Sequence, residues 1–314
     1  MRYRITGILM ASAAMLLPIA GVAQADYPER PVTFIVPWPP GDIEDQLTRV
    51  IADEMSKETG VPARVVNRPG GGGIEGATAV SQAPADGYMV GSFVIDIPTM
   101  HIIQGNAAYG RDTFEPVGIF LTYPFALVAK ADAPYSDLAE LAAYAKSNPV
   151  RLGHFGYDLV PTMATFAAAR ALDFSFSADA AFDGLDCSTL ATGDVDVMNT
   201  TMATVLGCLD DVKVIAAYTE EPLSVKPDGK LLSDQVEGLD ITLWNGLFVP
   251  AGTPQAVKDK IATIAERAVA SEAARNLAEA TGAGVYWMGA EESAARIEAD
   301  YTAAEELLKA ASGN

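Results

Sequence analysis

The chain contains 314 residues, of which 50% are hydrophobic, and its 41 Asp and Glu residues against 21 Lys and Arg residues give a formal net charge of −20. This acidity argues against nucleic acids and anionic membrane surfaces as partners, because both attract basic patches. At about 100 to 200 residues per domain, the length indicates two domains.

Residues 1–25 are typical of a secretory signal peptide. Arg2 and Arg4 precede an apolar run, which ends in the small-residue pattern A-Q-A at residues 23–25. No later segment approaches the roughly 18 consecutive apolar residues of a membrane span. We therefore expect a cleaved signal peptide and a mature protein, from Asp26 onward, that is soluble outside the cytoplasm.

After the signal peptide, apolar runs alternate with segments of helical period, which is typical of an α/β fold. A strand is expected at 32–36 and a helix at 43–59, where Leu47 and Ile51 share one face and Gly60 follows as a left-handed cap. Further strands are expected, in chain order, at 63–66, 88–94 and 125–130.

A second α/β unit is expected after Pro134. Its predicted elements are a helix near 136–147, a strand near 150–153, a helix from about Thr162, and strands at 195–198 and 212–217. The tail after Pro254 is expected to be helical, with a short strand at 285–288. Because no repeat or low-complexity linker separates the two units, we expect strands to join them, and such a junction can hinge.

A glycine-rich segment lies between the second and third expected strands. Gly71, Gly73 and Gly76 have the G-x-G-x-x-G spacing of a dinucleotide-binding loop, and Asp96 follows at about the expected distance of 20 residues. Four consecutive glycines produce this match easily, and exported proteins seldom meet soluble nicotinamide cofactors. We therefore expect no cofactor, and a loop that offers backbone N–H groups to a ligand in a cleft.

The sequence offers little material for catalysis or metal binding. His101 and His154 are the only histidines, and no serine lies in a G-x-S-x-G elbow. The metal-binding patterns H-E-x-x-H, C-x-x-C and the EF-hand loop do not occur. The segment G-D-I-E-D at 41–45 has oxygens for calcium, but its spacing matches no standard loop. We expect neither catalytic residues nor a metal site, and a loop role for His154.

Cys187 and Cys208 are the only cysteines. In an oxidising compartment they are expected to form a disulfide. Two buried thiols remain the alternative, because the sequence does not show whether the two Cα atoms come within about 7 Å.

Four segments together resemble one family. They are YPERPVTFIVPWPPG, VVNRPGGGG, ADGYMVGS and NGLFVPAGTP. In order and spacing they resemble the Bug family of extracytoplasmic solute receptors, the binding proteins of tripartite tricarboxylate transporters. The resemblance spans nearly all of the mature chain. It implies a non-enzymatic, monomeric periplasmic receptor that captures a small ligand, usually a carboxylate, and delivers it to the membrane components of the transporter.

The resemblance also implies an α/β two-domain periplasmic binding protein fold with a ligand cleft between the domains. Domain one would comprise residues 26–124 plus 250–314, and domain two residues 125–249. Hinge crossovers are expected near TYPFALV and LFVPAG.

By position, the resemblance assigns ligand contacts to five loops. The family's first pocket loop, P-F-P-P-G-G-G-T-D, falls on residues 37–45, and its Y-K-G turn falls on 182–184. The residues assigned to the ligand are Trp38, Asp42, Glu44, Asp45, Ser92, Asp96, Asp158, Thr162, Phe182, Asp183, Asn199 and Thr200.

The first pocket loop keeps the family's frame and changes its chemistry, because Asp42 and Glu44 replace glycine and threonine. In the family, N–H groups and the helix dipole receive a ligand carboxylate, often through water. A carboxylate about 4 Å from each unpaired acid would meet repulsion of a few kcal/mol at an effective dielectric constant of about 20. As N-cap and first-turn residues, Asp42, Glu44 and Asp45 could also serve the helix alone.

That helix role does not account for Asp158 and Asp183, and we therefore hypothesise a ligand other than a simple dicarboxylate. It would present an ammonium or several hydroxyls to the acids, or keep a carboxylate only near Gly70–Gly73 or through a bound cation. Trp38 would cover an apolar or cationic part of the ligand, or form a rim contact between domains. Binding of an ordinary dicarboxylate should tighten in Asp183→Lys.

Two other functions stay open at this point. An exported enzyme could use the glycine loop for a nucleotide, which turnover or nucleotide-dependent fluorescence would reveal. A ligand sensor for a membrane regulator would need the same cleft as a transport receptor, and neighbouring genes would separate the two.

Overall fold

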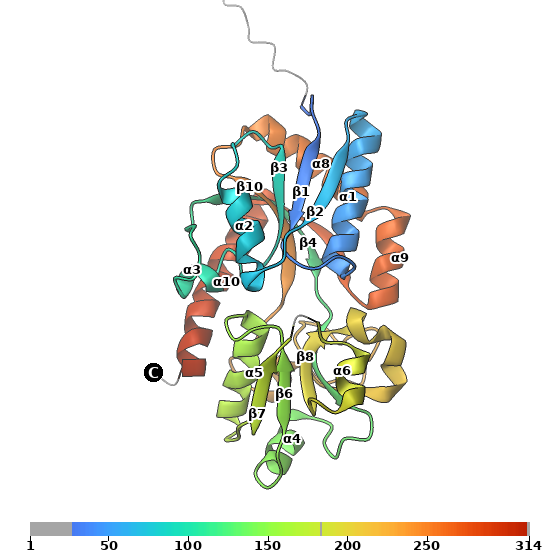
Figure 1. Cartoon of the computed structure of the whole chain (residues 1–314), viewed down its shortest axis with the longest axis vertical. Coiled ribbons are helices and arrows are strands. Elements are labelled where there is room, and N and C mark those ends of the chain that lie inside the picture. The colour runs from blue at the N-terminus through green and yellow to red at the C-terminus, as the bar shows by residue number, and fades with distance from the viewer. Residues whose placement is uncertain (1–26, 183, 313–314) are drawn as a thin grey trace, which may run out of the picture.

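The structure is a computed structural model that describes residues 27–182 and 184–312. The predicted signal peptide and the predicted ligand contact Asp183 lie outside the described residues. The elements form two lobes stacked along the long axis of the molecule, each built on its own sheet (Figure 1). The mixture of helices and strands confirms the α/β class.

The first sheet has six strands in the order β11-β4-β10-β3-β1-β2. Its strands are β1 (Val32–Val36), β2 (Ala63–Asn67), β3 (Met89–Val94), β4 (Phe114–Thr122), β10 (Trp244–Pro250) and β11 (Gly284–Gly289). β1 runs parallel to β2 and β3, whereas β10 is antiparallel to both β3 and β4. The continuous apolar run of β1 reflects burial on both faces, as in parallel sheets.

Helices cover this sheet. They are α1 (Ile43–Thr59), α2 (Ile74–Ser81), α3 (Met100–Ile103), α8 (Gln255–Val269), α9 (Glu272–Thr281) and α10 (Ala290–Ser312), with a short 3-10 turn, η1 (Gly71–Gly73). In α1, Leu47, Ile51 and Met55 are fully buried, and Gly60 ends the helix at φ 70°. These features confirm the predicted helix and its left-handed cap.

The second sheet has five strands in the order β7-β6-β8-β5-β9. Its strands are β5 (Phe125–Lys130), β6 (Arg151–His154), β7 (Ala178–Ala181), β8 (Val197–Thr201) and β9 (Val212–Ala217). Around it lie α4 (Leu138–Ala145), α5 (Val160–Ala171), α6 (Cys187–Thr192), η2 (Met202–Asp211) and α7 (Leu232–Gln235). A disulfide between Cys187 and Cys208, with Cα atoms 6.0 Å apart, joins α6 to η2 and confirms the predicted pairing.

The chain links the two sheets in three places. It passes from β4 to β5 through residues 123 and 124, and it returns between β9 and β10. In addition, α10 packs against β4 of the first sheet and against α5 beside the second (Figure 1). The division into two domains stays a prediction, and the pairing of β10 in the first sheet would move the return boundary from residue 249 to before Trp244.

The strands β4, β7 and β10 were not predicted, and β4 shows why. Its sequence contains Pro116 and Gly118, which are usual signs of a turn. Pro116 is tolerated because the β4–β10 ladder shifts register next to it, between Leu247 and Phe248. At Gly118 an added Cβ would lie 2.4 Å from the Trp287 ring, so glycine makes room for that ring. Across the described residues, none of the helices is both long and apolar enough to span a bilayer.

Candidate functional site

A cavity of about 360 Å³ lies between the two sheets. Its first wall comes from the loop between β1 and α1 and from the end of β3, and includes Trp38, Asp42, Glu44 and Asp96. Its second wall comes from β5, the loop before α5 and the start of η2, and includes Phe125, Phe155, Leu159, Thr201 and Thr204. Tyr123, in the crossover from β4 to β5, lies between the two walls.

The loop from β1 into α1 is shaped by three prolines and by Gly41. Gly41 has φ +107°, a value that favours glycine, and the chain turns there into the helix. Asp42 is the N-cap residue of α1, and its Oδ1 accepts a hydrogen bond of 2.8 Å from the N–H of Ile43. This turn brings the first residues of α1 to the cavity.

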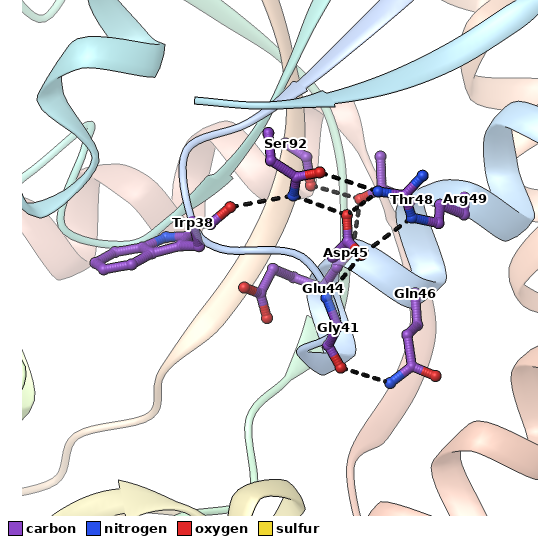
Figure 2. Close-up of polar contacts among 9 residues, drawn as sticks. Trp38, Gly41, Glu44, Asp45, Gln46, Thr48, Arg49 and Ser92 are labelled. Atoms are coloured by element: carbon purple, nitrogen blue, oxygen red, sulfur yellow. Dashed lines mark hydrogen bonds and ion pairs between the residues drawn. The ribbon is translucent and has the colours of Figure 1, made fainter. Parts of the chain in front are cut away.

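Asp45 faces away from the cavity and is held by protein groups (Figure 2). Its carboxylate accepts hydrogen bonds from Arg49 at 2.9 and 3.0 Å, from Asn67 at 2.9 Å and from the N–H of Gly41 at 2.9 Å. Burial opposes its ionisation, but these hydrogen bonds outweigh burial and lower the pKa of Asp45. The geometry gives Asp45 a structural task, which is to fasten the loop to α1 and β2.

The neighbouring Glu44 has the opposite environment. Its side chain points away from the Asp45 and Arg49 contacts, on the side of the loop that carries Trp38 (Figure 2). The residue is 2% exposed, and no described residue offers a hydrogen bond to its Oε2. Burial raises the pKa of Glu44 well above its ordinary value, and nearby Asp42 adds to this, while a hydrogen bond from the Tyr123 hydroxyl opposes it.

Asp42 also has a raised pKa, chiefly because of burial, while its hydrogen bond from Ile43 acts in the opposite direction. The negative charge of Asp45 adds to the rise. Two adjacent cavity acids are therefore both pushed toward their neutral forms when the cavity holds no positive charge.

Asp96 belongs to the first wall and forms a hydrogen bond to the second. It follows β3, and its Oδ1 accepts a hydrogen bond of 2.6 Å from the N–H of Val160, the first residue of α5. Burial raises the pKa of Asp96 to about 6, against the influence of His101 and of the Val160 hydrogen bond. His101 Nδ1 lies 3.7 Å from Asp158 Oδ2 in the same region, so a second pair joins the two lobes.

Ser92 lies behind the cavity rather than in it. Its hydroxyl is 2.8 Å from that of Thr48 in α1 and accepts a 2.7 Å hydrogen bond from Asn245 in β10. Asn245 Oδ1 in turn accepts a 3.4 Å hydrogen bond from the Tyr123 hydroxyl. This buried polar chain connects α1 and two strands to the cavity residue Tyr123.

The predicted contacts of the second lobe lie mainly beneath its wall. Asn199 Nδ2 donates to Thr165 Oγ1 at 3.0 Å, and Thr200 Oγ1 donates to the carbonyl of Leu185 at 2.9 Å. Thr162 is fully buried, and no described group pairs with its hydroxyl. Phe182 is half-buried and packs in the second hydrophobic core, and its neighbours Gly184 and Leu185 line the cavity.

The glycine-rich segment packs against the protein and is not part of the cavity lining. The carbonyl of Gly72 accepts a 2.8 Å hydrogen bond from His101 Nε2. A Cβ at Gly76 would lie 2.7 Å from Pro37, so glycine lets α2 approach the loop after β1. Gly72 and Gly76 thus serve close packing, and the expectation that this loop offers N–H groups to a ligand stays a prediction.

Several cavity residues were missing from the sequence analysis. Tyr123 and Phe125 belong to the predicted crossover TYPFALV, and a chain segment that crosses between lobes must border the cleft. Thr201 directly follows the predicted Thr200, whereas Phe155 and Thr204 had no sequence signal that we can identify. Among residues 27–182 and 184–312, no three His, Cys, Asp or Glu side chains are grouped to hold a metal ion. The arrangement suits enclosure of a ligand.

Comparisons of the sequence and of the structure with known proteins point to the same receptor family. Residues 47–312 match the family model described as "Tripartite tricarboxylate transporter family receptor". A protein of Agrobacterium vitis from the TAR-I ttuE-ttuC' intergenic region is 28% identical over 269 residues, which cover 83% of this chain and 77% of the relative.

Two solved structures are similar over most of their length. The periplasmic binding protein BugD is 26% identical, with 90% of this chain and 98% of BugD covered and a TM-score of 0.79. MatC from Rhodopseudomonas palustris with bound malate is also 26% identical, with 90% and 99% covered and a TM-score of 0.79.

Proposed function

Because the chain belongs to the family of tripartite tricarboxylate transporter receptors, we propose that it captures a small organic acid in the cavity between its two sheets and delivers it to the membrane components of such a transporter. The family and the similar structures are solute receptors and not enzymes. A periplasmic location after cleavage of residues 1–25, and a monomeric state, are parts of the proposal.

The observation that carries the proposal is the cavity itself. Both lobes contribute a wall, so a ligand held there touches both at once. A ligand that binds both walls favours the arrangement in which they are close. The short crossover at residues 123 and 124 supports hinge closure between the proposed domains, 26–124 plus 250–314 and 125–249.

We propose different tasks for the residues that the sequence analysis assigned to the ligand. Those that line the cavity are proposed as contacts, namely Trp38, Asp42, Glu44 and Asp96, with Tyr123, Phe125 and Thr201 added. Those that lie behind the cavity are proposed to support its walls, namely Asp45, Ser92, Asp158, Thr162, Phe182, Asn199 and Thr200. Asp183 is kept as a proposed contact from its sequence position alone.

Thermal unfolding of the mature chain against small organic acids tests the proposal. A ligand at 100 times its dissociation constant that binds only the folded state adds about 2.7 kcal/mol of stability, which raises the unfolding temperature clearly. Ala203 lines the cavity, and Ala203→Trp should fill it and abolish the rise. Ala303 is exposed on α10, so Ala303→Trp is the matched control that should keep it. An equal rise in both variants would place binding elsewhere.

A further inference from the structure

The two walls of the cavity differ in charge. The acids Asp42, Glu44 and Asp96 all belong to the first wall. Every described residue that the second lobe contributes is uncharged, and none of the described lining residues on either side is Lys, Arg or His. The protein therefore supplies negative charge to its ligand on one side and no described positive charge on the other.

Glu44 is the acid whose position calls for a partner. Only 2% of Glu44 is exposed, and the residue lines the cavity. Its Oε2 has no hydrogen-bond partner among the described residues. The Tyr123 hydroxyl gives this carboxylate one neutral hydrogen-bond donor, and the other oxygen is left unpaired. A buried carboxylate with an unpaired oxygen is costly, and in most proteins such a group is fully paired. Helix capping does not account for Glu44, because Asp42 already provides the cap of α1.

The nearest cation of the same helix is not free to serve Glu44. Arg49 donates three hydrogen bonds to Asp45 and Asn67, on the far side of the loop (Figure 2). Asp45 is also the acid whose pKa these contacts lower, whereas the pKa of Glu44 is raised. None of the described cavity residues supplies a positive charge to Glu44, so an ionised Glu44 can obtain one only from the ligand.

We propose that the ligand carries a protonated amine, with Glu44 as its direct partner and Asp42 as a second attracting acid. The inference rests on the proposed function, because it takes this cavity as the place of capture. The carbon chain of the ligand packs on Phe125 and Phe155, and the Trp38 ring at the same wall suits contact with a cation. The ligand is thus an amine-bearing acid rather than a plain dicarboxylate.

The rival chemistry is a protonated Glu44 that donates a hydrogen bond to a ligand carboxylate. The two arrangements differ in where the proton goes. An ammonium partner stabilises the ionised carboxylate, so Glu44 releases its proton to the buffer when the amine binds. A ligand carboxylate needs that proton to stay on Glu44, so its binding strengthens as the pH falls.

The experiment is calorimetric titration of the mature chain with two probes of similar length, succinate and 4-aminobutanoate. They differ in that an aminomethyl group of one takes the place of a carboxylate of the other. We expect 4-aminobutanoate to bind at least about 10-fold more tightly, a difference of about 1.4 kcal/mol. Titrations in buffers of different ionisation enthalpy should show proton release for the amine.

Glu44→Gln keeps the shape of the side chain and removes its charge. It should weaken binding of 4-aminobutanoate by about 10-fold or more and abolish the proton release. Glu266 is exposed on α8, so Glu266→Gln removes the same charge away from the cavity and should change neither. Because Gln needs no desolvated charge, the variant should remain folded, which circular dichroism checks.

The remaining outcomes separate this inference from the proposed function. If succinate binds at least as tightly as the amine, and Glu44→Gln does not weaken the amine, the inference is wrong while the receptor function stands. Succinate binding that strengthens at low pH and needs Glu44 would establish the rival chemistry. If neither probe binds, and no organic acid shifts the unfolding temperature, both the inference and the proposed function fail.

Discussion

Two helices, α1 and α5, begin at the same cavity but are capped in different ways. α1 has its own N-cap, Asp42, and its first turn carries Glu44 and Asp45. α5 begins with Val160 and Pro161, and the side chain that caps its first N–H is Asp96 from the other lobe. The start of α1 is therefore complete within one lobe, whereas the start of α5 is complete only while the lobes are together.

Because of this difference, substitutions at the start of α1 should change the free energy of unfolding, whereas substitutions of Asp96 should change the equilibrium between closed and open forms. Side chains that fasten α1 should matter for unfolding of the first lobe in any arrangement of the two. Asp96 should matter mainly for the balance between closed and open forms, because opening returns both its carboxylate and the Val160 N–H to water. Substitutions in the two regions should therefore have effects in different measurements.

The largest effect is expected for Asp45→Ala. The substitution removes a buried carboxylate that accepts four hydrogen bonds, two of them from Arg49, and leaves the Gly41 N–H without its acceptor. Hydrogen bonds to a charged group contribute about 1.5 to 3 kcal/mol each when buried. Because water can replace Asp45 as a partner of Arg49, part of this contribution is recovered. We therefore expect the free energy of unfolding to fall by about 2 to 3 kcal/mol. Urea unfolding measures it.

Asp53 provides the control for this substitution, because it is an exposed acid of the same helix. Asp53→Ala should change the free energy of unfolding by no more than about 0.5 kcal/mol. A similar small change in Asp45→Ala would mean that the loop does not depend on these hydrogen bonds.

A smaller effect, of a different kind, is expected for Asp96→Ala. Loss of a capping side chain costs about 0.5 to 2 kcal/mol, and here the loss falls on the closed form. At pH 4, where the raised pKa of Asp96 keeps its carboxyl largely neutral while the lobes are together, small-angle X-ray scattering of the ligand-free protein should show a larger radius of gyration, and ligand affinity should fall by a few-fold to about 10-fold. Asp96→Asn keeps an acceptor oxygen and should give the milder change. Unchanged scattering with lowered stability would make Asp96 an ordinary structural residue.

The positions of these acids explain how much of the site could be predicted. Trp38, Asp42 and Glu44 follow β1 and Asp96 follows β3, and in α/β sheets the loops after parallel strands form the ligand crevice. Position in the chain was therefore enough to bring them to the cavity. It could not show that Glu44 faces the cavity while the adjacent Asp45 faces Arg49, because this depends on side-chain partners far along the chain.

Residues inside strands were harder to predict than residues at strand ends. Ser92 belongs to β3, where its side chain is directed to Thr48 in the core. Asn199 and Thr200 belong to β8, and it is the last residue of that strand, Thr201, that reaches the cavity. Side chains alternate between the faces of a strand, so an error of one residue moves the assignment to the opposite face. Long periodic elements such as α1 tolerate errors of that size.

The equilibrium between the closed and open forms should also depend on pH, because Asp96 caps α5 from the other lobe. The pKa of Asp96 is raised from 3.8 to about 6 while the lobes lie together as in this structure, and in the proposed open, hydrated form it should return toward 3.8. The closed form therefore holds the proton more tightly, is favoured most below about pH 4, and loses this advantage as the pH rises to about 6. Between pH 5 and pH 7 the loss is about 1 kcal/mol.

Scattering at the two pH values measures this opening. Asp96→Asn should abolish the dependence. His101, Asp158 and Tyr109 surround Asp96, so His101→Gln is needed as a second variant. If the dependence persists in Asp96→Asn and disappears in His101→Gln, the histidine and not Asp96 is responsible.

The smallest effect on stability is expected for Asp42→Ala, although Asp42 is the N-cap of α1. Loss of an N-cap usually costs about 1 kcal/mol. Burial and the charge of Asp45 raise the pKa of Asp42, however, so its removal also relieves an unfavourable buried charge, and the two effects partly cancel at neutral pH. We expect a net loss of about 0.5 kcal/mol in urea unfolding at pH 7. At pH 4 a smaller fraction of the Asp42 carboxyl is ionised, so the charge penalty is smaller and the loss should be larger than at pH 7. A loss that is larger at pH 7 than at pH 4 would show that the ionised carboxylate stabilises α1, and that the acids at the start of this helix serve the helix before they serve a ligand.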